Sequence, residues 1–181
     1  VKEAERRGLP NIKTMVDAIP AFITDKTVDM FHRFKVYDKN ELESRVEVLY
    51  ETYAKEMNIE ARAMIDIASK HIIPAVIKYI TSLAHSINEV NAVGGMDVSC
   101  QTELLKKCSN LLAQAKEALK ALEAAQKKSG TLSEGKEQAE YFKDVVKEAM
   151  DQLRRPVDEL EMLVDKEMWP MPSYGDLIFE V

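Results

Sequence analysis

Two carboxylates and an imidazole, Asp25, Asp29 and His32, are spaced i, i+4 and i+7 in the sequence. On a helix they would share one face, and carboxylates with imidazole are ligands that transition metals accept. The same residues also suit a helix start: Thr24 or Asp25 can serve as N-cap, and Asp29 is a favourable acid in the first turn. Helix capping is the simpler interpretation, and a metal site is the alternative.

Other polar residues that could do chemistry lack partners in the sequence. His71 and His85 would lie about 21 Å apart along a helix, too far to share a metal ion. Glu56 and Glu60 form an i, i+4 pair, but neither a base, an acid nor a ligand accompanies them. A di-iron bundle would need Glu-x-x-His twice, and that motif pair is absent.

The sequence also contains no glycine-rich phosphate loop, no nucleophile elbow, no Cys-x-x-Cys and no His-Glu-x-x-His. We therefore predict no catalytic, cofactor-binding or metal-binding residue in this chain. The two cysteines, Cys100 and Cys108, would be about 12 Å apart on a helix, too far for a disulfide. They indicate free thiols in a reducing compartment, which predicts a cytoplasmic protein.

Composition excludes two classes of partner. The 181 residues carry a formal charge of −6, and phosphate binding needs a basic surface, so we expect no nucleic acid partner. The lysines of residues 99–128 alternate with glutamates, which is typical of a solvated helix face. There is no run of 18 apolar residues, so we expect no membrane span.

Residues 40–93 form the element around which the chain is organised. Their apolar residues recur at about 3.7-residue intervals, which predicts one helix of roughly 80 Å. Asp38 and Glu41 form a capping box at its start, and Tyr37 can pack on Leu42. Pro74 lies inside the pattern and predicts a bend at residues 70–74.

Two further long helices follow. One is expected over residues 99–128 and the other up to residue 168, opened by a capping box of Thr131 and Glu134. Pro156 predicts a kink near Gln152. The predicted fold is all-α: an elongated antiparallel bundle of three long helices, two of them kinked by proline. A short N-terminal helix precedes the bundle and an extended C-terminal tail follows it.

The two later helices are long enough to cover only the second half of the first. We therefore expect its first half to lack a partner in this chain and to face another surface. The apolar residues concerned are Leu42, Val46, Leu49, Tyr53 and Met57. Residues 1–8 are expected to be the end of a helix closed by Gly8, and residues 9–22 mostly loop. Because the chain begins in mid-pattern and without Met, we expect it to be a piece of a longer protein.

Four segments resemble the C-terminal region of type III glutamine synthetases. They are EAERRGLPNIKTMVDAIPAFI (3–23), ELESRVEVLYETYAKEMNIEARAMIDIASKHIIPAV (41–76), EQAEYFKDVVKEAMDQLRRPVDELE (137–161) and WPMPSYGDLIFEV (169–181). The last is the most specific, with the pattern WP-x-P-x-YGD-x-x-F. Met171 stands where members of the family often carry Phe. Residues 101–128 are generic Ala/Lys/Glu/Leu sequence.

The resemblance implies a parent enzyme that joins glutamate and ammonia with ATP and a divalent metal, Mg or Mn, through a γ-glutamyl phosphate. In that family the catalytic parts lie upstream, so the resemblance places no catalytic residue here. It implies a division into 1–37, the end of the catalytic region; 38–168, a helical domain; and 169–181, a docking tail. The implied partners are the upstream catalytic domain and neighbouring subunits of a dodecamer of two stacked hexamers.

Two other interpretations remain. A free-standing helical adaptor would use the exposed stripe of the first long helix to bind another helix. An autonomous enzyme has the least support, because no catalytic constellation is present.

Overall fold

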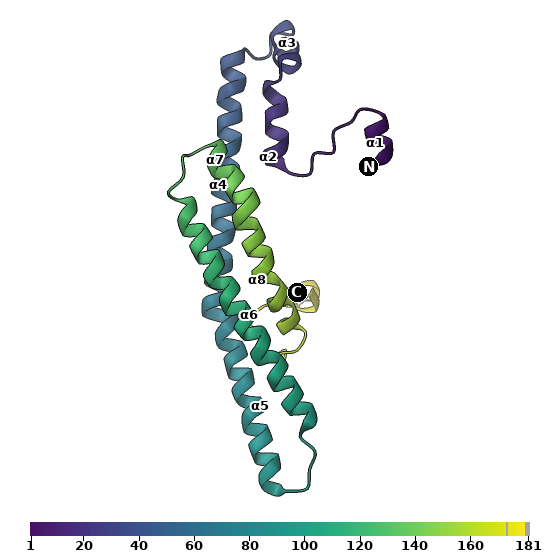
Figure 1. Ribbon diagram of the computed structural model, residues 1–181, viewed down its shortest axis with the longest axis vertical. Coiled ribbons are helices and arrows are strands. Elements are labelled where there is room, and N and C mark those ends of the chain that lie inside the picture. The colour runs from purple at the N-terminus through teal and green to yellow at the C-terminus, as the bar shows by residue number, and fades with distance from the viewer. Residues whose placement is uncertain (173, 180–181) are drawn as a thin grey trace. The chain divides into compact units, whose positions relative to one another are not determined.

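The computed structural model describes residues 1–172 and 174–179. The secondary structure of these residues consists of helices, with no β-strand (Figure 1). The all-α prediction is confirmed. The elements are α1 (Lys2–Arg6), α2 (Met15–Ala18), the 3-10 helix η1 (Ile19–Ile23), α3 (Asp25–Arg33), α4 (Lys39–Ile67), the π-helical turn η2 (Ala68–Ile72), α5 (Ile73–Val93), α6 (Ser99–Ser129), α7 (Lys136–Tyr141), the π-helical turn η3 (Phe142–Val146), α8 (Lys147–Glu161) and α9 (Tyr174–Phe179).

The chain divides into two compact units, which we describe separately. Unit 1 comprises Val1–Glu60 and Lys127–Lys147, and unit 2 comprises Ala61–Gln126 and Glu148–Val181. Each unit therefore contains part of the long helical stretches α4 and α6.

In unit 1, α4 begins at the predicted capping box. The Asp38 amide donates to Glu41 Oε2 and the Glu41 amide donates to Asp38 Oδ1, both at 2.8 Å. These bonds satisfy two of the backbone donors that a helix start leaves without intrahelical acceptors. The Tyr37 ring lies 5.5 Å from Phe31 and 4.2 Å from the Arg45 guanidinium. Its packing on Leu42 stays a prediction.

Removing the cap should weaken α4 measurably. Asp38→Ala is expected to lower the free energy of unfolding by about 1 kcal/mol, because the Glu41 amide loses its acceptor. Asp38→Asn keeps a side-chain oxygen at the N-cap and should lose much less. Chemical denaturation of both variants measures the difference, and equal losses would show that the cap bond is not the cause.

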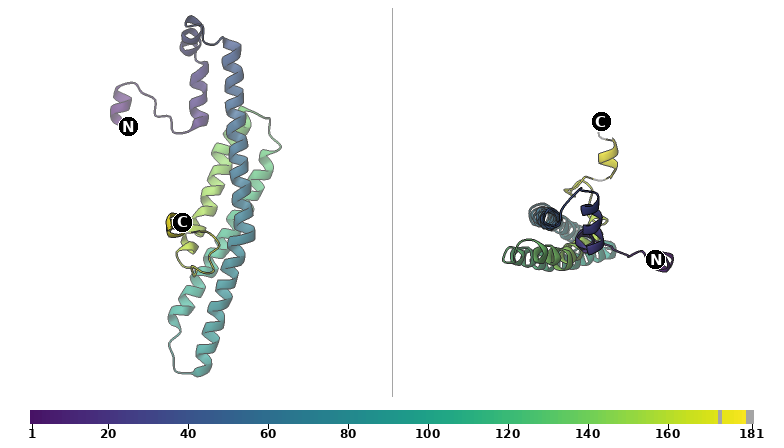
Figure 2. Two further views of the ribbon diagram at one scale, coloured as in Figure 1. Left: turned by 180° about the vertical axis from the view of Figure 1, so that it is seen from behind. Right: turned by 90° about the horizontal axis from the view of Figure 1, so that it is seen from above.

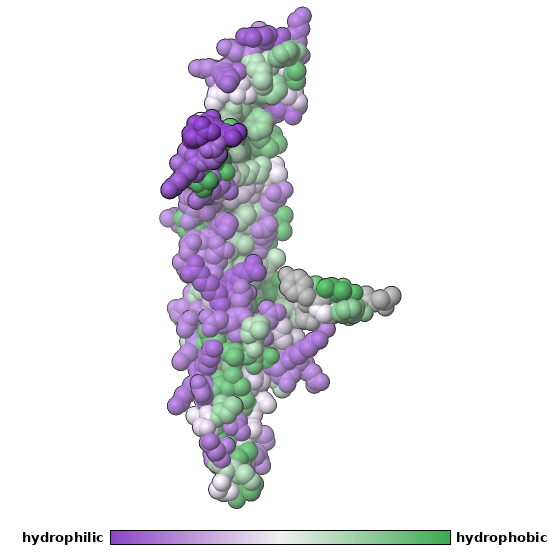
Figure 3. Space-filling view, turned by 90° about the vertical axis from the view of Figure 1, so that its right-hand side faces the viewer, coloured by the Kyte–Doolittle hydropathy of each residue, from purple (hydrophilic) through white to green (hydrophobic). Residues whose placement is uncertain are grey.

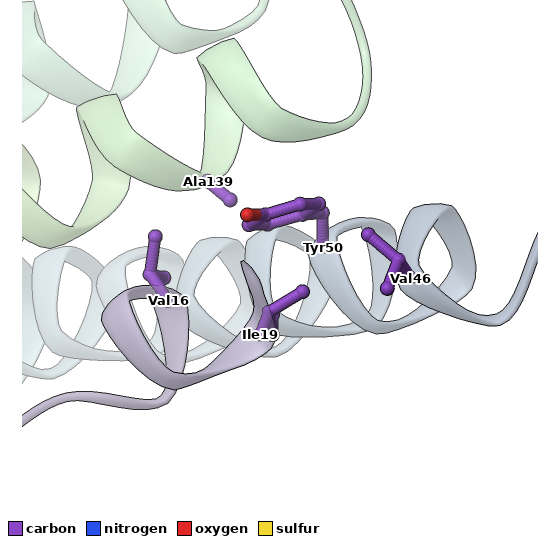
Figure 4. Packing of buried hydrophobic residues seen from close by; sticks show 5 residues of the cluster. All are labelled: Val16, Ile19, Val46, Tyr50 and Ala139. Atoms are coloured by element: carbon purple, nitrogen blue, oxygen red, sulfur yellow. The ribbon is translucent and has the colours of Figure 1, made fainter. Parts of the chain in front are cut away.

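The core of unit 1 is built from three segments distant in sequence. Val16 and Ile19 of α2 and η1 pack with Val46 and Tyr50 of α4 and with Ala139 of α7 (Figure 4). The expectation that the first half of the long helix has no partner in this chain was therefore wrong. The buried face of the helix also differs from the predicted one. Tyr50 and Ala54 are buried, whereas Leu49, Tyr53 and Met57 are only half-buried.

The covering segment was missed because its prolines suggested a loop. The Thr14 hydroxyl caps α2 by accepting from the Asp17 amide at 3.2 Å. Pro20 lies in the first turn of η1, where a missing N–H costs no helical hydrogen bond. Proline there is compatible with a helix, so residues 15–23 are helical and bring Val16 and Ile19 onto α4.

In unit 2, α5 and α6 lie side by side and antiparallel, with α8 packed beside them (Figures 1 and 2). Gly94 and Gly95 have positive φ of 80° and 74° and end α5 as predicted, because glycine adopts that conformation without steric cost. The buried residues of unit 2 are mostly aliphatic: Ala61, Ala68, Ile72, Ala75, Val76, Cys108, Leu111, Ala115, Leu119, Leu122, Ala125, Ala149, Leu153, Leu160 and Val164.

Helix α4 continues into α5 through η2, directly before Pro74. The Ile73 amide donates to the Ala68 carbonyl, five residues earlier, instead of the usual four. Such a widened turn accommodates a proline that can donate no hydrogen bond. The continuous helical stretch is confirmed, and the bend at residues 70–74 stays a prediction.

The third long helix differs from the expectation at both ends. Thr131 does not open it: its hydroxyl donates to the Lys128 carbonyl at 2.7 Å, and α7 starts after Gly135. Helix α8 ends at Glu161 rather than near residue 168. Asp165 forms a separate turn, accepting from the Glu167 amide through its carboxylate and from the Trp169 amide through its carbonyl, and this competes with the helix.

The π-helical turn η3 lies at Phe142–Val146 and does not coincide with Pro156, which lies inside α8. The kink predicted near Gln152 stays a prediction.

The tail contains helix α9, so the expected extended conformation was wrong for Tyr174–Phe179. Asp176, an acid in the first turn of α9, binds Lys166 Nζ at 2.8 Å. The predicted tail also included Ser173, Glu180 and Val181, which lie outside the described residues.

Candidate functional site

The structure does not join the metal-ligand candidates of α3 into a site. Asp25, Asp29 and His32 are all exposed on that helix. Thr24 caps it by accepting from the Thr27 amide, so the capping interpretation holds with Thr24 as the N-cap. In residues 1–172 and 174–179 no three His, Cys, Asp or Glu side chains gather in a way that could hold a metal ion.

The remaining candidates are also separate. Glu56 and Glu60 are both exposed. His85 Nε2 lies 3.8 Å from the Glu89 carboxylate, one turn away on the same helix. The described part of the chain has no helix long and apolar enough to cross a membrane.

The two cysteines have different surroundings. Cys100 is exposed and Cys108 is buried, and both are free thiols. Burial raises the pKa of the Cys108 thiol, which disfavours the reactive thiolate. Cys108 therefore acts as a small apolar core residue.

Unit 2 contains one hollow that sequence reasoning missed, with a volume of about 370 Å³. Its walls come from the η2–α5 junction and from the segment after α8. They are lined by Lys70, His71, Pro74, Ala75, Lys78, Glu167, Met168 and Pro170. The only signal in the sequence was His71, and no local pattern connects it with residues so far along the chain.

The hollow combines two lysines, an imidazole and a carboxylate with apolar side chains. Lys70 is engaged with Asp66 one turn earlier on its own helix. Beside this wall, the indole N–H of Trp169 is buried without a hydrogen-bond acceptor among the described residues.

The longest-range polar contact of unit 1 joins α2 to η3. Lys143 Nζ donates to Asp17 Oδ1 at 2.8 Å, and the Lys143 side chain is only 18% exposed. The hydrogen bond from Lys143 lowers the pKa of Asp17 most, and the hydrogen bond from the Thr14 hydroxyl lowers it further. The same bond raises the pKa of Lys143. This pair fixes α2 on the rest of unit 1 next to the buried Val16.

The Asp17 pair should make stability depend on pH. Because the pKa of Asp17 is lower folded than unfolded, its contribution is present above the unfolded value of about 3.9 and disappears as the pH falls through the folded value. Asp17→Asn should therefore lower the midpoint of thermal unfolding at neutral pH and cause little further loss in strong acid. Asp144→Asn is the matched control, since Asp144 lies 3.3 Å from the same lysine but is more exposed. A pH-independent effect of Asp17→Asn would contradict the expectation.

Comparison with known proteins identifies the family. The model of the "Glutamine synthetase C-terminal domain" matches residues 1–91. The whole chain is 33% identical over 183 residues to a glutamine synthetase of Butyrivibrio fibrisolvens, covering 26% of that protein. A glutamine synthetase of Bacteroides fragilis is 27% identical over 98% of the chain, and a type-3 glutamine synthetase of Dictyostelium discoideum is 28% identical over 97%.

The chain spans about a quarter of the length of these relatives. The similarity runs through both units, whereas the family model covers half of the chain. The resemblance to type III glutamine synthetases is confirmed by the family model and by the type-3 relative, and the chain belongs to the glutamine synthetase C-terminal domain family.

Proposed function

We propose that this chain is the C-terminal part of an ATP-dependent glutamate–ammonia ligase, which forms glutamine. The observation that carries the proposal is the similarity of nearly the entire chain to one quarter of three glutamine synthetases. The remaining three quarters would contain the sites for ATP, the divalent metal (Mg or Mn) and glutamate. We assign no catalytic, cofactor-binding or metal-binding residue to residues 1–181.

Within that enzyme the chain would serve in packing, positioning or assembly. Support comes from the character of its buried residues, which are almost all apolar, with Ser129 the one buried polar residue among those described. A core of this kind makes a scaffold and offers no acid–base pair. We propose residues 1–37 as the end of the catalytic region, 38–168 as the helical domain and 169–181 as a docking tail.

The tail supports a docking role through its exposed apolar side chains, Leu177, Ile178 and Phe179. Apolar residues gathered on one short helix are typical of a surface that another part of the protein covers. The proposed partners are the catalytic domain of the same chain and neighbouring subunits of a homo-oligomer, a dodecamer in the cytoplasm.

The first test is the size and activity of the native polypeptide. An antibody against this chain should detect a polypeptide several times larger than 20.5 kDa in the source cell. That polypeptide, once purified, should form glutamine from glutamate, ammonia and ATP with Mg or Mn. A band near 20.5 kDa would overturn the proposal and favour a free-standing helical adaptor. A large polypeptide without this activity would equally overturn it.

A further inference from the structure

The short helix α3 carries an apolar face that nothing in unit 1 covers. None of its nine residues is buried. Phe34, which ends the helix, is 71% exposed, and Val36 is 52% exposed. Helix η1 adjoins α3 and contacts it. We define the α3 face as the exposed apolar residues of η1, of α3 and of the turn that follows α3: Phe22, Ile23, Met30, Phe34 and Val36. Apolar surface lies over this end of unit 1 and is bordered by hydrophilic residues, at the top of Figure 3.

A helix of this length does not hold itself together in water. Isolated helices shorter than about 12–15 residues are marginal, and protein helices gain most of their stability by packing an apolar face. Within the chain α3 contacts η1, its Thr27 hydroxyl donates to the Ala21 carbonyl at 2.8 Å, and its Phe31 ring lies against Tyr37. These contacts leave the side chains of Met30, Phe34 and Val36 exposed, so they are available to another surface.

The backbone holds Phe34 and Val36 in a defined position. Lys35 between them has φ of 54°, a left-handed conformation that is unfavourable for a non-glycine residue. The Lys35 amide donates to the His32 carbonyl and the Val36 amide to the Phe31 carbonyl, both at 3.0 Å. These bonds make a tight helix end that fixes the backbone of both residues.

The charged residues next to Phe34 are basic, whereas Asp29 adjoins Met30. Arg33 and Lys35 flank Phe34, and within the described residues neither has a carboxylate partner. A surface that covers Phe34 should therefore offer carboxylates at its edge, because opposite charges across an interface set orientation and register.

We propose that the α3 face packs against the part of the same polypeptide upstream of Val1, on an apolar surface bordered by carboxylates. The inference rests on the proposed function, which supplies that region: the relatives carry about three quarters of their length outside the matched part. The α3 face lies in residues 22–36, close in sequence to where that region would join. A second copy fits less well, since a two-fold contact through this face would bring Arg33 and Lys35 toward their own counterparts.

Photo-cross-linking in the full-length protein tests the occupant. Phe34 is replaced by p-benzoylphenylalanine, and Val48 is replaced likewise as the control, because Val48 is 57% exposed in the same unit but lies outside the α3 face. Light and heavy isotope-labelled protein are mixed and allowed to exchange before illumination. The Phe34 position should cross-link to peptides upstream of Val1 in chains of the same isotope, in several-fold higher yield than the Val48 position.

Several outcomes would overturn the proposal. Cross-links between light and heavy chains would mean that another copy covers the face. Cross-links that stay within residues 1–181, or a yield no higher than that of Val48, would mean that no upstream surface covers it. As a second measurement, Phe34→Asp should lower the midpoint of thermal unfolding of the full-length protein more than Val48→Asp does, and equal shifts would count against the proposal.

The activity assay separates this inference from the function on which it rests. A full-length protein that shows the upstream cross-link but forms no glutamine would overturn the proposed function and leave the docking surface in place. A protein that forms glutamine but shows no upstream cross-link at Phe34 would overturn the docking surface alone.

Discussion

Replacing Phe142 by alanine is expected to destabilise the protein by about 3–5 kcal/mol. Phe142 begins the π-helical turn η3 and is 1% exposed, and it is among the largest fully buried side chains of the described chain. Alanine would remove most of the apolar contact of the ring and leave a cavity that the surrounding helices can fill only in part. Since domains are commonly stable by only about 5–15 kcal/mol, this loss would be a large fraction of the total.

The control is Val145→Ala, three residues along the same turn. Val145 is 40% exposed, so its truncation removes less buried surface and should cost well under half as much. Chemical denaturation followed by far-ultraviolet circular dichroism measures both variants. Equal losses for Phe142 and Val145 would show that burial of the aromatic ring is not what stabilises this turn.

Leu122→Ala is expected to cost about 2–5 kcal/mol, for the same reason in unit 2. Leu122 of α6 is 0% exposed and belongs to the buried row with Leu119 and Ala125. Alanine has a higher helix propensity than leucine, so α6 itself should persist. The loss should therefore come from packing between helices, and the helical signal of the folded variant should equal that of the parent.

Glu123→Ala, at the neighbouring exposed position, tests that reasoning. The substitution also introduces alanine into α6, but it removes no buried surface and should change the free energy of unfolding by less than about 0.5 kcal/mol. A loss in Glu123→Ala comparable to that in Leu122→Ala would mean that the helix, and not its buried row, sets the stability of unit 2.

The proposed function rests on the arrangement of the helices. The capping box of Asp38 and Glu41 and the glycine turn at Gly94 fix where α4 begins and α5 ends. Exposed apolar residues lie on the α3 face and on α9, among other places along the chain. The proposed assembly role would need well-defined helices and apolar surfaces that the rest of the enzyme covers.

Local signals in the sequence predicted α4, α5 and α6. The apolar period predicted the continuous helical stretch from α4 to α5, and residues 99–128 predicted α6 to within one residue of its end. Asp38 and Glu41 are only three residues apart, so their mutual capping needs no distant partner. Family membership was likewise readable from the sequence, because it rests on the order of residues along the chain.

Only the tertiary structure decided what covers the first half of the long helix. Periodicity shows that one face of a helix is apolar, but it does not name the segment packed on that face. Residues 15–23 looked like loop because of Pro20, yet they place Val16 and Ile19 on Tyr50. Tyr50 lies in the core of unit 1, whereas the predicted Leu49 is only partly buried against it.

The hollow of unit 2 was beyond sequence reasoning for the same physical reason. His71 lies at the junction of η2 and α5, whereas Glu167 and Met168, which line the same hollow, come from the turn after α8. The start of α4 follows from hydrogen bonds between neighbours in sequence, so the sequence predicted it. Buried faces and hollows depend on which distant segments pack together, and only the folded chain decides that.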